Sequence, residues 1–235
     1  MQGLLLVDKP KGWTSFDVVN YVRKIVAEHE GKKPKNCKVG HTGTLDPLAT
    51  GLLVLLIGKE YTKRAQELTK LDKTYQVTMK LGETSTTGDA EGQKTVWKNA
   101  NNPTEVKMPS ENEVLDVLKK FTGEMMQTPP AYSAIKINGK KAYDLARKGH
   151  EVVIEPRKVT IYDIRNIEYT YPRVSFTCDV SSGTYIRSLA EDVGKALDTG
   201  AYMSDLRRTK VGGYKIDGAV SVKDIGMSHI IFADI

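Results

Sequence analysis

The sequence is poor in the residues that hold disulfide-linked or metal-containing proteins together. Its 235 residues include only two cysteines, Cys37 and Cys178, which lie far apart along the chain. The four histidines are also widely separated, and neither a Cys-x-x-Cys nor a His-x-x-x-His pair occurs. These absences argue against a disulfide framework and against a zinc site. We therefore expect two free thiols in a reducing compartment and no bound metal.

Long hydrophobic runs and nucleotide-binding motifs are missing as well. The apolar run near the N-terminus, Leu4 to Val7, is too short for a signal-peptide core or a membrane span. No Gly-x-Gly-x-x-Gly or Gly-Lys-Ser/Thr loop occurs, which argues against a nucleotide-dependent enzyme. We expect a cytoplasmic protein that does not associate with membranes and uses no nucleotide cofactor.

Basic residues are in moderate excess. The chain has 35 Lys and Arg against 29 Asp and Glu, a net charge of +6. This excess favours a polyanionic partner, but charge that only keeps a protein soluble explains it equally well. Charge alone does not decide between the two.

Apolar alternation and apolar stripes at helical spacing predict strands and helices in an irregular order. Strands are expected at residues 4–7, 52–57, 73–81, 152–167 and 173–180, with a short one at 95–97 inside a polar surface segment from 82 to 109. Helices are expected to begin at Thr14 or Ser15, at Ser110 and near Thr184. Because no repeat or linker divides the chain, this pattern indicates an α+β fold with a mixed, mainly antiparallel sheet flanked by helices.

One loop, Gly40 to Gly51, combines three glycines and a proline with a single carboxylate, Asp46. The residue before a proline is disfavoured in helices, so Asp46 is expected in an extended or turn conformation. Its carboxylate then either points into a cleft or makes a local turn or cap. From spacing alone the structural role is the more common one.

Four segments together resemble a known family. They are residues 40–51, 8–15, 129–136 and 182–189, and they closely resemble motifs of the TruB family of pseudouridine synthases in the family's order. The resemblance extends from Leu4 to about Tyr214. It implies the pseudouridine synthase fold and the isomerisation of uridine 55 in the T-loop of tRNA, with flipping of the target base and no cofactor. It also implies that Asp46 is the nucleophile.

The resemblance further implies roles for five residues. Arg187 matches the arginine that keeps the nucleophile ionised, and Tyr75 matches a tyrosine that stacks on the target base. Tyr185 and Leu206 match positions that line the uracil pocket, and His41 matches a residue that contacts RNA near the extruded nucleotide. Without the resemblance, Tyr75 would be interpreted as a core aromatic, Arg187 as part of a structural ion pair and His41 as a surface residue.

The basic residues suggest where RNA binds. Residues 127–149 contain two prolines and many basic residues and are interpreted as a mobile basic insert. We expect an RNA-binding insert at about 124–152, and the expected phosphate contacts are Lys136, Lys140, Lys141, Arg147, Lys148, Arg207, Arg208 and Lys210. Solvated surface charge is the alternative for each cluster.

Family members commonly continue into a C-terminal PUA domain, and too few residues follow Tyr214 to form one. We therefore expect a single catalytic domain at residues 1–235 without a PUA domain, which binds the T-arm of tRNA as a monomer. A non-catalytic RNA chaperone and a guide-dependent pseudouridine synthase are the alternatives. The presence of Asp46, Tyr75 and Arg187 argues against the first, and the expected absence of a PUA domain argues against the second.

Overall fold

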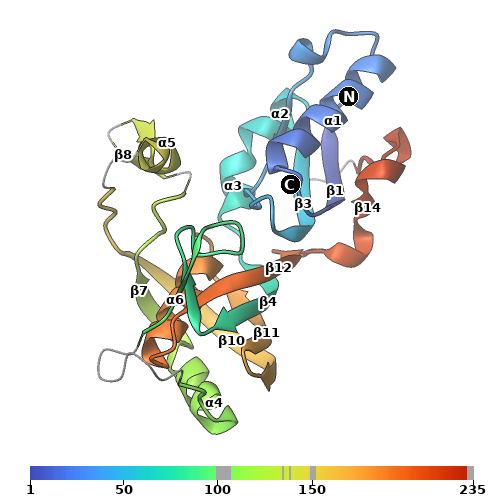
Figure 1. Cartoon of the computed structure of the whole chain (residues 1–235). Coiled ribbons are helices and arrows are strands. Elements are labelled where there is room, and N and C mark those ends of the chain that lie inside the picture. Colours follow the sequence, from blue (N-terminus) through green and yellow to red (C-terminus); the bar gives the residue numbers. More distant parts are fainter. Residues whose placement is uncertain (99–106, 134, 138, 149–151, 232–235) are drawn as a thin grey trace. The chain divides into compact units, whose positions relative to one another are not determined.

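The computed structural model of the chain describes residues 1–98, 107–133, 135–137, 139–148 and 152–231 (Figure 1). The chain forms two compact units. The first unit combines Met1–Tyr75 with Leu206–Ile235, and the second is the continuous stretch Gln76–Asp205. Among the described residues, no helix is both long and apolar enough to cross a membrane.

The first unit is built around a sheet with the strand order β14, β1, β3, β12, with β2 added to β3 and β13 to β12. Its elements are β1 (Gly3–Lys9), α1 (Ser15–His29), the 3-10 turn η1 (Pro34–Asn36), β2 (Val39–His41), β3 (Thr50–Ile57), α2 (Lys59–Lys63), α3 (Ala65–Thr69), the second half of β12 (Ala201–Val211), β13 (Tyr214–Lys215), η2 (Ile216–Gly218), β14 (Val220–Ser221), η3 (Val222–Asp224) and η4 (Met227–His229). Strand β1 runs antiparallel to β3, while β14 and β12 join the sheet in parallel.

Strand β3 is apolar at nearly every position because this sheet is covered on both faces. Leu53, Leu55 and Ile57 belong to one core cluster, together with the buried stripe of α1. Leu52 and Val54 belong to a second cluster on the opposite face, which includes Leu68 of α3. A continuous apolar run in the sequence thus corresponds to alternating contributions to two cores.

Helix α1 is capped by Thr14, one of the two expected capping residues. The Thr14 hydroxyl accepts a hydrogen bond from the backbone N–H of Asp17 (3.0 Å), and the Asp17 carboxylate accepts one from the Thr14 backbone N–H (2.8 Å). This reciprocal capping box satisfies two of the free donors at the helix start. The same arrangement starts α4, with Ser110 and Glu113 in the two roles.

The second unit contains the sheet order β12, β4, β11, β10, β7. Its elements are β4 (Lys73–Leu81, of which the first three residues belong to the first unit), β5 (Glu83–Ser85), β6 (Lys94–Val96), α4 (Glu111–Lys120), β7 (Gly123–Gln127), β8 (Lys136–Ile137), β9 (Lys140–Lys141), α5 (Ala142–Arg147), β10 (Arg157–Thr170), β11 (Arg173–Val180), α6 (Ile186–Ala196) and the first half of β12. Strand β10 runs antiparallel to both β11 and β7.

The expected α+β class with a mixed, mainly antiparallel sheet is confirmed. Several boundaries differ from expectation, and three of the differences concern the second unit. Strand β10 begins at Arg157 rather than 152, β6 lies one residue earlier than 95–97, and β7 places residues 124–127 of the expected insert within the sheet. Strand β12 was not predicted at all.

The polar segment from 82 to 109 is only partly a surface excursion. Asp89 within it is 3% exposed and forms a bridge with Met203. Residues 99–106 of this segment and 149–151 of the expected insert lie outside the described part of the chain.

Candidate active site

The loop that carries Asp46 connects β2 to β3 in the first unit. Asp46 is partly exposed, and the residue before it, Leu45, is buried. The backbone N–H of Ala49 donates to the Asp46 carbonyl (3.0 Å), and that of Gly12 donates to the Pro47 carbonyl (2.8 Å). The carboxylate therefore sits in a tight turn that is tied to the segment after β1.

Ser15 fixes the backbone directly before Asp46. Its hydroxyl accepts a hydrogen bond from the Leu45 N–H (2.8 Å) and donates one to the Leu45 carbonyl (3.0 Å). Ser15 is 2% exposed, so water does not compete for these bonds. The local sequence indicates Ser15 only as a helix cap and does not predict this role, because the contact joins residues 30 positions apart.

Replacing Ser15 with Ala should lower kcat about tenfold and leave KM within about twofold, because about 1.4 kcal/mol of positioning is lost at the carboxylate. Steady-state kinetics on a tRNA transcript would measure this. The control is Thr14→Ala, which removes the neighbouring helix cap and about 1 kcal/mol of stability without touching the loop. Equal kcat values in the two variants would show that Ser15 serves only folding.

Lys9 holds the same region from inside. Its side chain is fully buried, and its ammonium donates to the carbonyls of Trp13 (2.6 Å), Pro10 (3.0 Å) and Pro47 (3.4 Å). A buried ammonium must be compensated by such acceptors. Lys9 thus ties the turn after β1 to the turn that contains Asp46.

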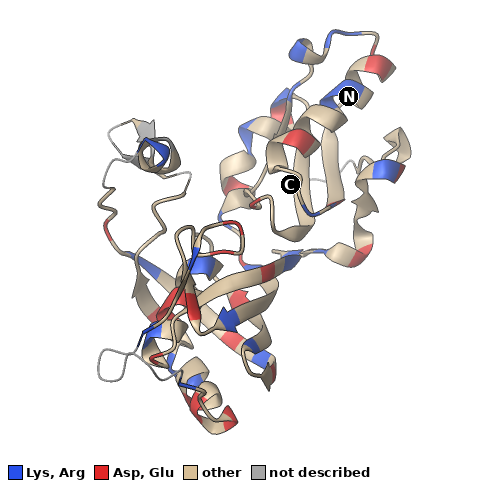
Figure 2. Ribbon diagram, in the orientation of Figure 1, with Lys and Arg blue, Asp and Glu red and all other residues tan. Residues whose placement is uncertain are grey.

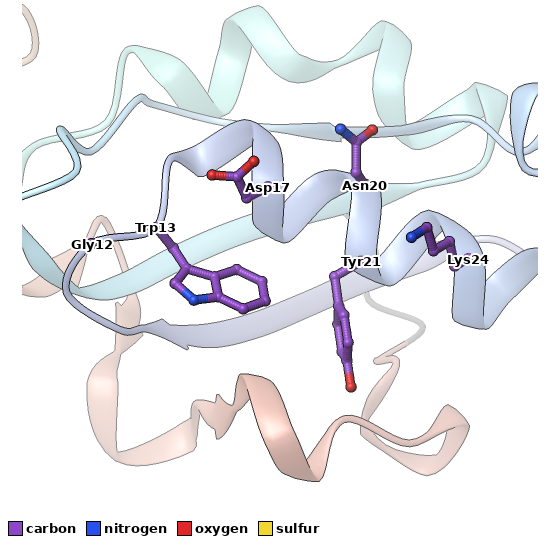
Figure 3. Close-up of a pocket in the computed structure, with 6 residues that line it drawn as sticks. All are labelled: Gly12, Trp13, Asp17, Asn20, Tyr21 and Lys24. Carbon is purple, nitrogen blue, oxygen red and sulfur yellow. The ribbon is translucent and has the colours of Figure 1, made fainter.

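An open pocket of about 500 Å³ lies along α1 and is lined by Gly12, Trp13, Asp17, Asn20, Tyr21 and Lys24 (Figure 3). The rings of Trp13 and Tyr21 meet edge to face with their centres 5.9 Å apart, and both pack against the core beneath α1. None of the expected site residues lines this pocket. Gly12 lines this pocket and also bonds Pro47 of the Asp46 loop, but no residue of the loop itself lines it.

Arg208 lies beneath the Asp46 loop and is 1% exposed. Its guanidinium donates to the carbonyls of Leu52 (2.8 Å) and Gly43 (3.1 Å), which lie on either side of Asp46. This placement corrects the expectation that Arg208 contacts phosphate. Its side chain is buried, and its guanidinium donates to backbone carbonyls inside the first unit. Its neighbour Arg207 forms a two-pronged ion pair with Asp8 (2.7 and 3.1 Å), so its charge is also already matched.

His41 and Lys73 lie within the electrostatic reach of Arg208. Burial, and secondarily the charge of Arg208, lowers the pKa of His41. The ring is then neutral at pH 7, and because Nδ1 accepts from the Gly43 N–H (3.3 Å), the proton resides on Nε2. A neutral His41 offers one N–H donor without adding a further positive charge.

Lys73 starts β4, and burial lowers its pKa to about 8, with a smaller contribution from Arg208. Below pH 8 it is protonated in both the folded and the unfolded chain, so the folded state carries the full cost of the buried charge. Between pH 8 and 10.5 the folded state has released a proton that the unfolded chain still holds. Stability should therefore rise with pH in this window.

Urea unfolding at pH 7.5 and 9.5 would test this assignment. Wild-type protein should gain on the order of 1 kcal/mol relative to Lys73→Met, after allowance for solvent screening. Lys70→Met, which removes an exposed lysine nearby, should keep the wild-type pH dependence. The same pH response in all three proteins would contradict the assignment.

Tyr75 and Leu206 lie on the neighbouring strands β4 and β12 and are 8% and 7% exposed. Both belong to the first unit, as do His41 and Asp46. Lys210, further along β12, is exposed. The structure thus brings four of the six expected active-site residues into one unit.

Arg187 and Tyr185 belong to the second unit, at the start of α6. The Arg187 guanidinium is nearly buried and donates to the carbonyls of Thr87 (3.1 Å) and Tyr132 (2.9 Å), with a carboxylate oxygen of Asp89 at 4.0 Å. It therefore joins two loops of this unit. Asp89 was missed in the sequence because a lone aspartate in a polar segment gives no signal of burial.

Gln127 is a second residue that sequence analysis missed. It is 1% exposed, and its amide both accepts from the Tyr185 N–H (2.8 Å) and donates to the Tyr185 carbonyl (3.1 Å). The two Gln127 hydrogen bonds fix the start of α6 and with it the backbone from which Tyr185 and Arg187 project. One turn further along α6, burial raises the pKa of Glu191.

The basic insert contains the hairpin β8–β9, which carries Lys136, Lys140 and Lys141, followed by α5. Arg147 and Lys148 at the end of α5 are exposed, and the Arg147 guanidinium lies 5.5 Å from the centre of the Tyr143 ring. In the described part of the chain, no group of three or more His, Cys, Asp or Glu residues is arranged to hold a metal ion.

Comparison with known proteins identifies the family. Residues 31–186 match the model of the TruB family pseudouridylate synthase (N terminal domain), which covers more than half of the chain. The chain belongs to the TruB family of pseudouridylate synthases. Residues 187–234 match the model of the tRNA pseudouridylate synthase B C-terminal domain. The two matches meet at Arg187, at the start of α6.

Individual proteins that are similar to this chain support the same family. The tRNA pseudouridine synthase B of Cupriavidus metallidurans is 45% identical over 228 residues, which is 96% of this chain and 67% of the relative. The tRNA pseudouridine synthase B of Bacteroides fragilis is 44% identical, and the matched region spans 91% of this chain and 88% of the relative. A chain solved in a Cbf5–Nop10–Gar1 complex is 30% identical with a TM-score of 0.69, over 94% of this chain and 53% of that chain.

Proposed function

We propose that this pseudouridylate synthase acts on tRNA and converts uridine 55 of the T-loop to pseudouridine, with Asp46 as nucleophile. Relatives named tRNA pseudouridine synthase B, at 40 to 45% identity over most of the chain, support tRNA as the substrate. The observation that carries the role of Asp46 is the bracing of its loop. Ser15, Lys9, Gly12 and Arg208 all bond backbone atoms of the loop or its flanks, so the carboxylate is held in a defined place.

The reaction needs little beyond a held nucleophile. The bond between C1′ and N1 of uridine breaks, the uracil turns, and a bond between C1′ and C5 forms, while the C5 proton is lost and N1 gains one. Atoms and electrons balance without an oxidant, a reductant or an energy donor. A carboxylate can form the transient covalent bond without activation by a second base.

The resemblance assigns roles to the other site residues. Arg187 is expected to favour the ionised form of the nucleophile, as a fixed guanidinium does for a carboxylate in a site that excludes water. Tyr75 stacks on the uracil, Leu206 and Tyr185 line its pocket, and the neutral His41 contacts the RNA beside the extruded nucleotide. Flipping the target uridine out of the T-loop costs a few kcal/mol, which contacts to the folded arm offset.

The cellular setting follows from the substrate. We propose that residues 1–235 act as one catalytic domain, as a monomer in the cytoplasm, and that the insert at about 124–152 contacts the T-arm. In the described part of the insert, the exposed side chains of Arg147 and Lys148 support phosphate contacts there.

Release of tritium from tRNA transcripts labelled at C5 of uridine tests the proposal. Wild-type protein should release tritium from an intact transcript and not from one in which uridine 55 is replaced by cytidine. Release from both transcripts would refute the site, and no release from either would refute the activity. Release only after addition of a guide RNA would favour the guide-dependent alternative.

A further inference from the structure

The first unit carries a group of lysines that the proposed site does not use. Lys33, Lys35 and Lys38 lie in the segment between α1 and β2, and Lys59 begins α2. All four are exposed, and none has an acidic partner among the described residues. We call these four residues the β2 lysine patch; Figure 2 shows basic residues along the connection between α1 and β2.

The patch lysines differ from the neighbouring Lys32 and Lys63, because those two have acidic partners. Lys32 pairs with Glu30 (2.9 Å), and Lys63 pairs with Glu60 (3.0 Å). These two acids are thereby occupied. The charge of the four patch lysines is therefore not offset by a nearby acid among the described residues.

The backbone under the patch is ordered by hydrogen bonds. The N–H groups of Asn36 and Cys37 donate to the carbonyls of Lys33 (2.9 Å) and Pro34 (3.0 Å), and Cys37 is anchored in the core. The Gly58 N–H donates to the Lys38 carbonyl (2.8 Å), which places Lys38 beside the start of α2 and Lys59. The lysines therefore form a preformed surface rather than a loose tail.

Strand β2 connects the patch to the Asp46 loop. Lys38 immediately precedes β2, and His41 ends it, so their Cα atoms are about 10 Å apart at about 3.3 Å per residue. A lysine side chain spans several ångströms more. The patch therefore lies at the start of β2, and the Asp46 loop follows the end of the same strand within one unit.

The composition of the patch favours a nucleic acid over a protein partner. Protein interfaces depend on buried aromatic and apolar anchors at their centre. The large exposed apolar side chains in the described part of the chain are Phe16, Val96, Met108, Met126, Val153, Tyr162 and Ile231, and none of them belongs to the patch segments. Charge without apolar anchors matches a phosphate backbone.

We propose that the β2 lysine patch binds the phosphate backbone of the RNA that flanks the target uridine, as a second contact surface in addition to the basic insert. This inference rests on the proposed function, because it requires RNA at the Asp46 loop. The patch contributes affinity and register to the bound RNA, and it takes no part in the chemical step.

The test is the triple variant Lys35→Gln/Lys38→Gln/Lys59→Gln with a matched control, Lys120→Gln/Lys215→Gln/Lys223→Gln. The control removes the same charge at exposed lysines of α4, β13 and η3. The patch variant should raise Kd and KM for the tRNA transcript roughly tenfold at 150 mM salt and leave kcat unchanged. Its plot of log Kd against log salt should lose about 0.7 to 0.9 in slope for each phosphate contact removed.

The control variant should change Kd less than about twofold, with both variants melting at the wild-type temperature. If the patch variant matches the control in Kd and in salt slope while wild-type protein forms pseudouridine, the patch inference is wrong and the proposed function stands. If wild-type protein forms no pseudouridine in any tRNA transcript, the proposed function fails and the patch inference fails with it.

Discussion

The Asp46→Asn variant should form no measurable pseudouridine, a loss of at least about 10⁴-fold, while its Kd for tRNA stays within about twofold of wild type. The amide has nearly the same shape as the carboxylate, so the turn closed by the Ala49 N–H and the Asp46 carbonyl is preserved. The amide cannot form the transient covalent bond. Tritium release and filter binding on the same transcript would separate chemistry from binding.

Asp224→Asn is the matched control for this experiment. Asp224 is an exposed carboxylate in η3 of the same unit, so its replacement changes charge equally without reaching the loop. It should keep wild-type turnover. Pseudouridine formation by Asp46→Asn at more than a trace of the wild-type rate would remove Asp46 as the nucleophile.

Gly51→Ala should destabilise the first unit by about 3 to 5 kcal/mol, enough to prevent folding at moderate temperature. Gly51 begins the packed part of β3 with φ +101°, a conformation that side chains rarely adopt. An added Cβ would also lie 2.8 Å from the backbone nitrogen of Arg208 and closer still to its carbonyl oxygen. Both atoms belong to a strand that cannot shift without disturbing the sheet.

Gly12→Ala separates the two contributions. Gly12 also has a positive φ, +84°, but an added Cβ would meet no heavy atom within 4 Å. Its replacement should cost only about 1 to 2 kcal/mol of backbone strain. Urea unfolding of both variants measures the difference, and equal losses would show that the close approach of β3 and β12 is unimportant.

The elements with regular apolar spacing were predictable from sequence. Strand β4 shows buried Tyr75, Val77 and Met79 at alternate positions, and α4 starts at its capping box, both as expected. Strand β12 was missed because charged and polar residues interrupt its apolar positions. Its alternation is nevertheless present, since Leu206 and Arg208 are buried while Arg207 between them is partly exposed.

The residues of the candidate site likewise divide into those that the sequence predicts and those that it does not. Asp46 was found because glycines and a proline mark its loop and because the motif resembles that of a family. Ser15 and Gln127 were not found, since each acts through hydrogen bonds to backbone groups that are distant in sequence. Asp89 was not found because its carboxylate accepts hydrogen bonds from its neighbours Thr87 and Glu91, and nothing in the surrounding polar sequence indicates that it is buried. A polar residue that will be buried carries no local mark that distinguishes it from an exposed one. Arg208 was misassigned for this reason.

The split of the first unit along the chain has a consequence for synthesis on the ribosome. Arg207 pairs with Thr50, 157 residues earlier, and β14 completes the sheet from residues still closer to the C-terminus. The second unit is continuous, so its strands and helices emerge together and can fold first. Strands β1 and β3 must wait until nearly the whole chain has been made. Until then β3 lacks its partner β12 and β1 lacks its partner β14, so the first unit is the last part of the molecule to be completed.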